Sequence, residues 1–400
     1  MNAANFSIRN SRYHLLDKNL GQLWPSLNTF CSKLFKSRIN IGKLHESTKT
    51  SKTIRKKKPP WNILFFGSDA FSLETSKKLI DNMNTSPTPT VQSVEVVCKT
   101  TQCLVNNFSE ENHLKLYSWP IAVMKNKYDL GVVVSFGCLI PGKIIRMFPH
   151  GILNVHASLL PRWRGAAPII HTILNGDTVT GVSVMKIRPK QFDIGSILNT
   201  KSVPVPQACT SMQLQTLLAT EAAELLLHTL SQIPFHEDQE KEQEQANVTY
   251  AHKPTKEMMY INWAEQTCDM IDRQYRAFHE RVYLKTIWDC KVVKLLDMVD
   301  NETAKEYHVN LLLKQKLSVN SSDDVHPGTV LHYKKANCLM IKCVNGWVAF
   351  RRIIKGKTMT AQEFQNGFLC KVPANKICKF DSQKNYLYDD IYNKKRTIRS

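Results

Sequence analysis

Three common sequence features are absent from this chain of 400 residues. No run of about 18 apolar residues occurs, so the sequence holds no candidate for a transmembrane helix. The eleven cysteines form no C-x-x-C pair, and their odd number and irregular spacing argue against a disulfide framework or a zinc ribbon, so no metal site is expected. A single Gly67 follows the first expected strand where a dinucleotide site needs G-x-G-x-x-G, so such a site is not indicated.

Acidic residues are scarce near the N-terminus. Residues 1–58 hold 13 Lys and Arg against 2 acids, residues 246–400 hold 26 against 16, and the middle of the chain is close to neutral. The first segment has no uninterrupted apolar run and is typical of an organelle transit peptide, with a basic disordered arm that stays attached as the alternative. The second excess fits a domain that meets nucleic acid, although lysines that serve solubility alone explain it equally well.

Patterns of buried strands and amphipathic helices alternate between residues 59 and 231. Apolar runs typical of buried strands occur at 62–66, 91–98, 130–135, 152–156 and 180–187. Helices are expected at 70–83, at 166–174 and from residue 211, after the capping box of Thr210 and Gln213. This alternation predicts an α/β domain with a Rossmann-like parallel sheet over residues 59–231. The polar residues 232–248 are predicted to be an exposed linker.

The rest of the chain is rich in short β patterns. A helix near 264–278 precedes five such runs, separated by Asn, Asp and Gly turns, at 286–288, 292–296, 329–333, 339–344 and 347–354. Five short strands in a basic region predict a small OB-like β-barrel domain over residues 249–375. Residues 376–400 are expected to form a basic tail.

Polar side chains that suit acyl chemistry lie near the end of one expected strand. Asn154 and His156 alternate along 152–156, so they point to the same side near the carboxyl end, where α/β sheets place their sites. Asp193, in a loop leaving another strand, is expected to reach His156, set its tautomer and stabilise its charged form, while Asn154 donates to an oxyanion. This set fits direct acyl transfer better than an acyl-enzyme, because Ser158 lacks the nucleophile-elbow pattern. Taken alone, Asn154 and His156 fit satisfied polar groups at a sheet edge even better.

The loop S-L-L-P-R-W-R at residues 158–164 changes that balance. A loop that exposes leucines and a tryptophan beside two arginines is costly unless a flat or anionic molecule binds there. Packing of Leu159 or Leu160 into the core is the alternative explanation.

The run N-V-H-A-S-L-L-P-R-W-R-G-A-A-P at residues 154–168, followed by D-I-G at 193–195, resembles the signature of the methionyl-tRNA formyltransferases. With its basic leader, the chain resembles their mitochondrial members, over about residues 60–370. The N-x-H and L-P core alone is shared with other folate-dependent formyltransferases, which act on glycinamide ribonucleotide or nucleotide sugars. The chain departs from bacterial members at 98–112, where Lys99 is the only Lys or Arg in place of a basic loop, at Arg188-Pro189-Lys190, and after Phe278, where the usual prolines are missing.

The resemblance implies an enzyme that transfers the formyl group of 10-formyltetrahydrofolate to the α-amine of methionine on initiator Met-tRNA. Asn154, His156 and Asp193 are then catalytic. The folate pocket is lined by Phe136, Gly137, Leu139, Ser158, Leu159, Leu160 and Pro161. The tRNA or its amino acid contacts Arg162, Trp163 and Arg164. The implied protein is a monomer of the mitochondrial matrix that needs no metal or membrane and supports translation initiation. Formyl transfer to a small amine, hydrolysis of the donor, and RNA binding by a chain with a decayed catalytic domain are the alternatives.

Overall fold

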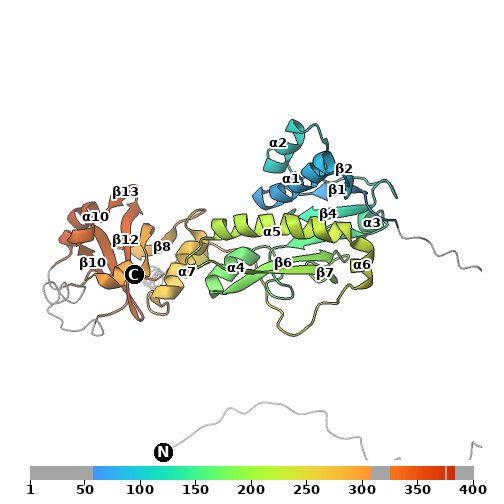
Figure 1. Ribbon diagram of the computed structural model, residues 1–400. Coiled ribbons are helices and arrows are strands. Elements are labelled where there is room, and N and C mark those ends of the chain that lie inside the picture. Colours follow the sequence, from blue (N-terminus) through green and yellow to red (C-terminus); the bar gives the residue numbers. More distant parts are fainter. Residues whose placement is uncertain (1–56, 308–324, 374–375, 383–400) are drawn as a thin grey trace, which may run out of the picture. The chain divides into compact units, whose positions relative to one another are not determined.

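The computed structural model describes residues 57–307, 325–373 and 376–382 (Figure 1). The predicted transit leader, residues 1–58, lies outside the described residues except for its last two positions. Most of the predicted basic tail, from residue 383 onward, also lies outside them.

The first part of the described chain is built on a mostly parallel sheet. Seven of the described strands form it in the order β3-β2-β1-β4-β5-β6-β7. Their bounds are β1 Trp61–Phe66, β2 Val91–Cys98, β3 Lys115–Ser118, β4 Leu130–Val134, β5 Ile152–His156, β6 Val179–Lys186 and β7 Ile197–Pro204. The first five are parallel to one another, whereas β6 runs antiparallel to β5 and β7 antiparallel to β6. The Rossmann-like sheet is confirmed, with two antiparallel strands added at one edge.

Strand β1 shows why the sheet is buried on both faces. Ile63 and Phe65 belong to one apolar core, and Leu64 and Phe66 to the other, because successive side chains of a strand point to opposite faces. The first core includes side chains of helices α1 Ala70–Thr85, α2 Leu104–Glu111, α4 Pro168–Asn175 and α5 Ser211–Ser231. The second core is closed by α3 Gly142–Ile145 and the loops around it.

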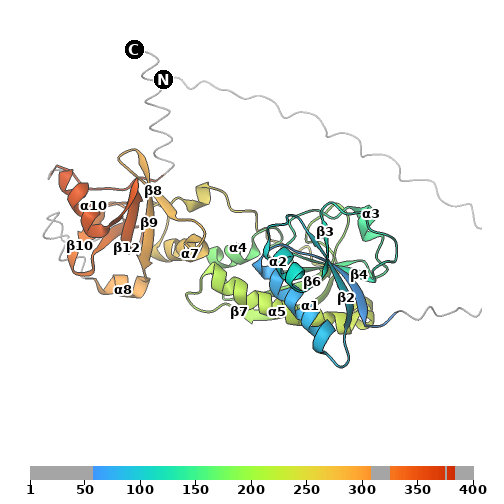
Figure 2. The same cartoon turned by 90° about the horizontal axis from the view of Figure 1, so that it is seen from above.

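The two long helices begin at capping boxes that can be identified in the sequence. Asp69 caps α1 with Ser72, and Thr210 caps α5 with Gln213, as predicted for Thr210. The two helices lie side by side in both views (Figures 1 and 2), and an ion pair of 2.6 Å joins Lys78 of α1 to Glu224 of α5.

The second part of the described chain forms an antiparallel sheet. Its strands follow the order β10-β11-β12-β9-β8, and β13 pairs with β12. Their bounds are β8 Leu284–Trp288, β9 Lys291–Val299, β10 Val330–Tyr333, β11 Cys338–Cys343, β12 Gly346–Lys355 and β13 Lys357–Thr360. The helices of this part are α7 Cys268–Phe278, α8 Asn301–Glu306 and α10 Ala361–Gly367. All five predicted β runs are confirmed as strands.

A short segment joins the two ends of this sheet into a closed ring. Asp381 exchanges two backbone hydrogen bonds with Ile287 of β8, and Val330 of β10 donates to the carbonyl of Cys378. Phe380 between them is fully buried. Closure supports the barrel expectation. It also moves the end of the domain to about residue 382, because the expected tail boundary at 375 leaves out residues that the barrel core contains.

The expected exposed linker at 232–248 is partly wrong. It contains helix α6 Ile233–Asp238, whose Ile233 and His236 are buried. Lys241 then exchanges two backbone hydrogen bonds with Ile197 of β7, so this polar segment covers the edge of the first sheet. Gln243 is also buried, at 6% exposure. Polar composition was misleading here because the buried Ile233, backbone pairing and one buried amide together hold the segment in place.

Candidate active site

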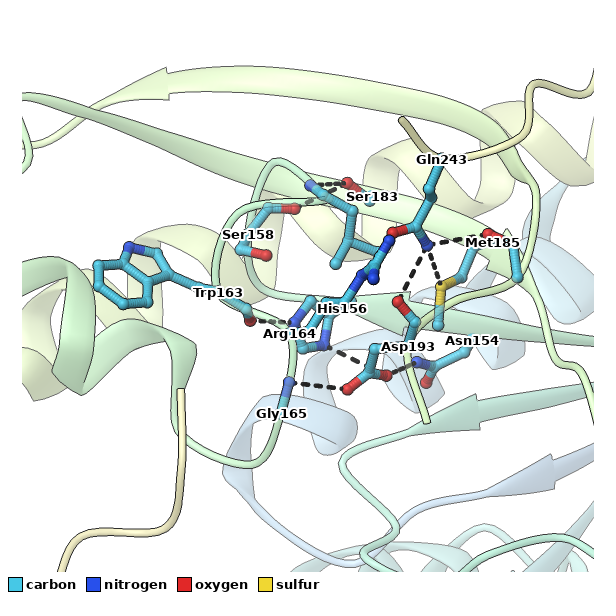
Figure 3. A network of polar contacts seen from close by, with 12 residues as sticks. Asn154, His156, Ser158, Trp163, Arg164, Gly165, Ser183, Met185, Asp193 and Gln243 are labelled. Carbon is cyan, nitrogen blue, oxygen red and sulfur yellow. Dashed lines mark hydrogen bonds and ion pairs between the residues drawn. The ribbon is translucent and has the colours of Figure 1, made fainter. Parts of the chain in front are cut away.

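The three predicted catalytic residues lie together. Asn154 and His156 project to the same side of β5, while Val155 points the other way into the core. Asp193 accepts a hydrogen bond from Asn154 Nδ2 at 3.1 Å through Oδ1, and another from the backbone N–H of Gly165 at 3.0 Å through Oδ2 (Figure 3). His156 Nδ1 lies 3.8 Å from Asp193 Oδ1. The side chains of His156 and Asp193 are only 8% and 10% exposed, so their interaction is weakly screened by water.

The tautomer of His156 is set by a backbone group, the carbonyl of Trp163, and not by Asp193 as expected. Its Nε2 lies 2.9 Å from the carbonyl oxygen of Trp163, and a carbonyl can only accept, so Nε2 carries a hydrogen. Nδ1 is therefore the nitrogen that gains and loses a proton, and it faces Asp193. Asp193 is placed to stabilise the imidazolium form, while the Trp163 carbonyl orients the ring.

The backbone of the two site loops is held in uncommon conformations. Trp163 has φ +59°, Asp193 has φ +55° and Gly165 has φ +123°. A Cβ on Gly165 would come within 2.7 Å of the carbonyl oxygen of Ala251, so only glycine allows its N–H to reach Asp193. Strained residues of this kind persist where surrounding contacts determine the backbone, which is common at functional sites.

Gln243 connects the loop that contains Arg164 to the loop that contains Asp193. Its Nε2 donates to the carbonyls of Asp193 at 3.0 Å and Gly195 at 2.9 Å, and its Oε1 accepts from Arg164 Nε at 2.9 Å. Figure 3 shows this amide between the loop of Arg164 and the loop of Asp193. The sequence offered no signal for it, because Gln239 and Gln245 stand in the same charged run and are exposed.

A cavity of about 780 Å³ opens over these residues. Phe136, Gly137 and Leu139, predicted to line the folate pocket, line it together with Asn154, His156 and Asp193. Three cationic side chains also belong to its lining, namely Arg188, Lys253 and Arg281. Phe192 lines it as well and is 59% exposed, which leaves an aromatic face available to a ligand.

Four predicted folate contacts are not part of this lining, namely Ser158, Leu159, Leu160 and Pro161. Ser158 is buried and donates its hydroxyl to the carbonyl of Arg162 at 2.7 Å, which also disfavours it as a nucleophile. Ser183 donates to the carbonyl of Ser158 and accepts from the backbone N–H of Leu160. These residues shape the loop, and Leu160 packs into the protein, as the alternative explanation allowed.

The two arginines of the loop differ in their surroundings, and neither lines the cavity. Arg162 forms a two-point ion pair with Asp177, at 2.9 and 2.6 Å, and Trp163 Nε1 donates to the same carboxylate at 2.7 Å. Burial alone would raise the pKa of Asp177, but the hydrogen bonds from Arg162, Asn175 and Trp163 outweigh it and hold that pKa below its usual value. Arg164 is only 6% exposed, so its guanidinium is not presented to a macromolecule.

Among the described residues, no group of three or more His, Cys, Asp or Glu side chains is placed to hold a metal ion. None of the described helices is long and apolar enough to cross a membrane.

Both the family matches and the similar known proteins are formyl transferases. The formyl transferase family matches residues 90–230, and the family described as formyl transferase, C-terminal domain, matches residues 253–369. The mitochondrial methionyl-tRNA formyltransferase of Homo sapiens is 39% identical over 318 residues, which cover 78% of this chain and 79% of the human protein. A methionyl-tRNA formyltransferase of Coxiella burnetii is 31% identical over 258 residues, covering 60% and 80% of the two chains.

Among solved structures, an N-formyltransferase from Helicobacter canadensis in complex with folinic acid and dTDP-3-aminofucose is similar, with a TM-score of 0.51. The similarity covers 72% of this chain and 98% of that one at 16% identity. At this identity the likeness concerns the fold.

Proposed function

From the premise that this chain belongs to the methionyl-tRNA formyltransferases, we propose how its described residues carry out the reaction. The protein is an enzyme that transfers a formyl group to Met-tRNA, and translation initiation is the process that this reaction serves. The observation that carries the mechanism is the cluster of Asn154, His156 and Asp193 on the wall of one cavity.

The proposed donor is 10-formyltetrahydrofolate. The cavity of about 780 Å³ falls in the range of small-molecule sites, and its wall combines apolar side chains with the polar and cationic groups described above. Phe136, Gly137 and Leu139 form part of the apolar wall that a flat pterin ring would contact. The structurally similar Helicobacter protein was solved in complex with folinic acid, which supports a folate as the donor for this chain.

The proposed transfer is direct, without a formyl-enzyme. The neutral α-amine of methionine attacks the formyl carbon, the new C–N bond forms, and the carbonyl electrons move to oxygen. Asn154 Nδ2 carries two hydrogens, of which one goes to Asp193, so the other is free to donate to the developing oxyanion. A free α-amine titrates near pH 7.7, so a useful fraction is already neutral at physiological pH.

Collapse of the oxyanion breaks the bond between the formyl carbon and the folate nitrogen. The amine has a proton to lose and that nitrogen has a proton to gain. In the proposed mechanism, His156 Nδ1 takes the proton from the amine and gives it to the folate nitrogen, because Nε2 is engaged by the Trp163 carbonyl. Asp193 lies within 3.8 Å of Nδ1 and stabilises the charged imidazolium between the two steps.

The proposed acceptor is initiator Met-tRNA, bound partly by the basic C-terminal domain that begins near residue 249 and ends at about residue 382. Lys253 and Arg281 belong to the cavity lining and are exposed, so they can meet phosphates of the tRNA end. Gln215 of α5 accepts a hydrogen bond from Arg281 and holds it at this place. Arg162 and Trp163 remain proposed tRNA contacts at the surface. For Arg164 we propose a supporting role in place of the predicted one, because it is buried against Gln243.

Relatives named as mitochondrial forms suggest a mitochondrial location. We propose the matrix, with residues 1–58 as the transit leader, and a monomeric enzyme.

The test of this function is incubation of the protein with labelled 10-formyltetrahydrofolate and either Met-tRNA or free methionine. Labelled formyl-Met-tRNA is expected, with turnover of free methionine lower by several orders of magnitude. Equal turnover of free methionine would favour the small-amine alternative. Release of labelled formate at the same rate with and without Met-tRNA would favour hydrolysis.

A further inference from the structure

Two thiols from distant parts of the chain contact each other in the antiparallel domain. Cys268 is the first residue of α7 and Cys343 is the last residue of β11, and their sulfur atoms lie 3.1 Å apart. Cys343 is fully buried, whereas Cys268 is partly exposed. Neither thiol takes part in formyl transfer as proposed above. Their spacing of 75 residues explains why no sequence pattern pairs them.

The surroundings of the two thiols shift their pKa values in opposite directions. The sulfur–sulfur hydrogen bond with Cys343 lowers the pKa of the Cys268 thiol, although burial and the neighbouring Asp269 oppose this, and the Cys268 backbone N–H and Lys342 lower it further. The same hydrogen bond, together with burial, raises the pKa of Cys343. Cys268 also stands at the N-terminus of an eleven-residue helix, where a negative charge is stabilised. Cys268 is therefore the more readily ionised thiol of the pair, and Cys343 the one that holds its proton more tightly.

The loop after β11 leaves room for both sulfur atoms. A Cβ on Gly346 would come within 3.0 Å of Cys268 Sγ, so a larger residue would push that sulfur away. Asn345 accepts a hydrogen bond from the backbone N–H of Cys268 at 2.9 Å and ties the start of α7 to this loop. The Gly346 carbonyl, 3.4 Å from Cys343 Sγ, offers a second acceptor for the Cys343 proton. A disulfide needs sulfur atoms about 2.05 Å apart, so the pair has about 1 Å left to close.

We propose that Cys268 and Cys343 are a modification site, a dithiol that hydrogen peroxide converts to a disulfide. The Cys268 thiolate attacks one peroxide oxygen, the O–O bond breaks, and Cys268 becomes a sulfenic acid with release of hydroxide. Cys343 then attacks the Cys268 sulfur, the S–O bond breaks, and the Cys343 proton leaves with the hydroxyl group as water. Both thiols are oxidised and one peroxide is reduced. An added dithiol such as dithiothreitol reverses the reaction by exchange.

Other cysteines of the described residues serve as internal comparisons. Cys98 lies beside Cys103, but burial raises the pKa of Cys98 to about 12, so it offers almost no thiolate to peroxide. Cys290 is exposed and can be reached by peroxide. If access alone decided oxidation, the exposed thiols Cys290 and Cys370 would react before Cys268.

The test treats the full-length reduced protein with one to two equivalents of hydrogen peroxide, blocks free thiols and maps the peptides by mass spectrometry without reduction. The expected product is a cross-linked pair of peptides containing Cys268 and Cys343, formed about tenfold faster than any oxidation of Cys290. The disulfide should raise Tm by about 5–10 °C, because it closes a loop of this length in the unfolded chain, and dithiothreitol should reverse the shift.

Single substitutions separate the role of Cys268, which reacts with peroxide, from that of Cys343, which then forms the disulfide. In Cys343→Ser the sulfenic acid on Cys268 has no resolving thiol and should accumulate as a dimedone adduct, whereas Cys268→Ser should leave Cys343 unmodified. Cys290→Ser is the matched control and should give the wild-type disulfide and Tm shift. Oxidation of Cys290 ahead of Cys268, or a Cys268 adduct in the wild type that never becomes a cross-link, would overturn the proposal. If Cys343→Ser does not fold, the wild-type peptide map and Tm shift still decide the question.

Discussion

Gln243 offers a sharp test of how the site is held, because it lies outside the cavity lining and can act only through the residues that it holds. Its side chain makes three hydrogen bonds with oxygen and nitrogen partners, two to the carbonyls of Asp193 and Gly195 and one from Arg164, beside a longer one of 3.6 Å to the Met185 sulfur. The substitution Gln243→Ala removes all three and leaves two buried carbonyls and one guanidinium N–H without this partner. The substitution Gln243→Glu keeps the acceptor for Arg164 but loses both donated bonds.

The size of the effect follows from these contacts. A buried polar group left unsatisfied costs about 1–3 kcal/mol, so Gln243→Ala is expected to lower the free energy of unfolding by about 3–5 kcal/mol, and Gln243→Glu by about 2–3 kcal/mol. The catalytic effect is separate. A misplacement of catalytic groups by about 1 Å can reduce a rate about 100-fold, so a loosened Asp193 should lower kcat by about that factor in both variants. KM for Met-tRNA should stay within about twofold.

The assay is steady-state formylation of Met-tRNA beside chemical denaturation of the same preparations. Gln245→Ala is the matched control, because Gln245 lies in the same charged run and is exposed. It should leave both stability and kcat unchanged. If Gln243→Glu folds with wild-type stability and keeps more than half of the wild-type kcat, then the Asp193 loop does not depend on Gln243 and the reasoning fails.

Three further substitutions probe the loop and the cavity mouth. Asp177→Asn should lower the free energy of unfolding by about 2 kcal/mol at pH 7, measured by denaturation. Because the pKa of Asp177 is depressed in the folded protein, the wild type should lose this stability as pH falls below about 4, and the variant should lose less over that window. Gly165→Ala should reduce kcat at least tenfold in the formylation assay, since φ +123° and the Ala251 carbonyl force its N–H away from Asp193. Arg281→Glu should raise KM for Met-tRNA about tenfold and reduce the salt dependence of tRNA binding, with kcat nearly unchanged.

Each of these three predictions can be contradicted by a specific result. If the free energy of unfolding of Asp177→Asn depends on pH in the same way as that of the wild type, then the ion pair with Arg162 does not stabilise the protein. Wild-type activity of Gly165→Ala would mean that its N–H is not needed by Asp193. An Arg281→Glu variant with unchanged KM and salt dependence would place the tRNA elsewhere.

The strands and the shared face of Asn154 and His156 were predictable from the sequence because both depend on local periodicity. Asn154 and His156 share a face of β5 since side chains alternate along any strand, and the apolar runs at 91–98 and 152–156 coincide with β2 and β5. The position of Asp193 near His156 was an inference from a loop and a resemblance, and the structure places its carboxylate within 3.8 Å.

What could not be predicted depends on contacts between distant residues. Gln243 is the same residue type as Gln239 and Gln245 in the charged run, and only the fold decides which glutamine turns inward. The Trp163 carbonyl orients His156 through a backbone atom, which carries no mark in the side-chain sequence. Phe380 closes the barrel from a segment whose basic neighbours resemble a tail, because burial of one aromatic ring outweighs the composition around it.

The central claim is that the formyl group moves directly from the folate to the amine, and that Asn154, His156 and Asp193 catalyse this transfer. The measurement that tests it is a single-turnover, rapid-quench assay of labelled formyl transfer to Met-tRNA by the wild type and by His156→Ala, with donor affinity and folding checked on both. Loss of the proton carrier predicts a transfer rate lower by about 10²–10⁴ with donor affinity nearly unchanged. A His156→Ala rate within about threefold of the wild type, or a labelled formyl-protein formed at the rate of transfer, would contradict the account.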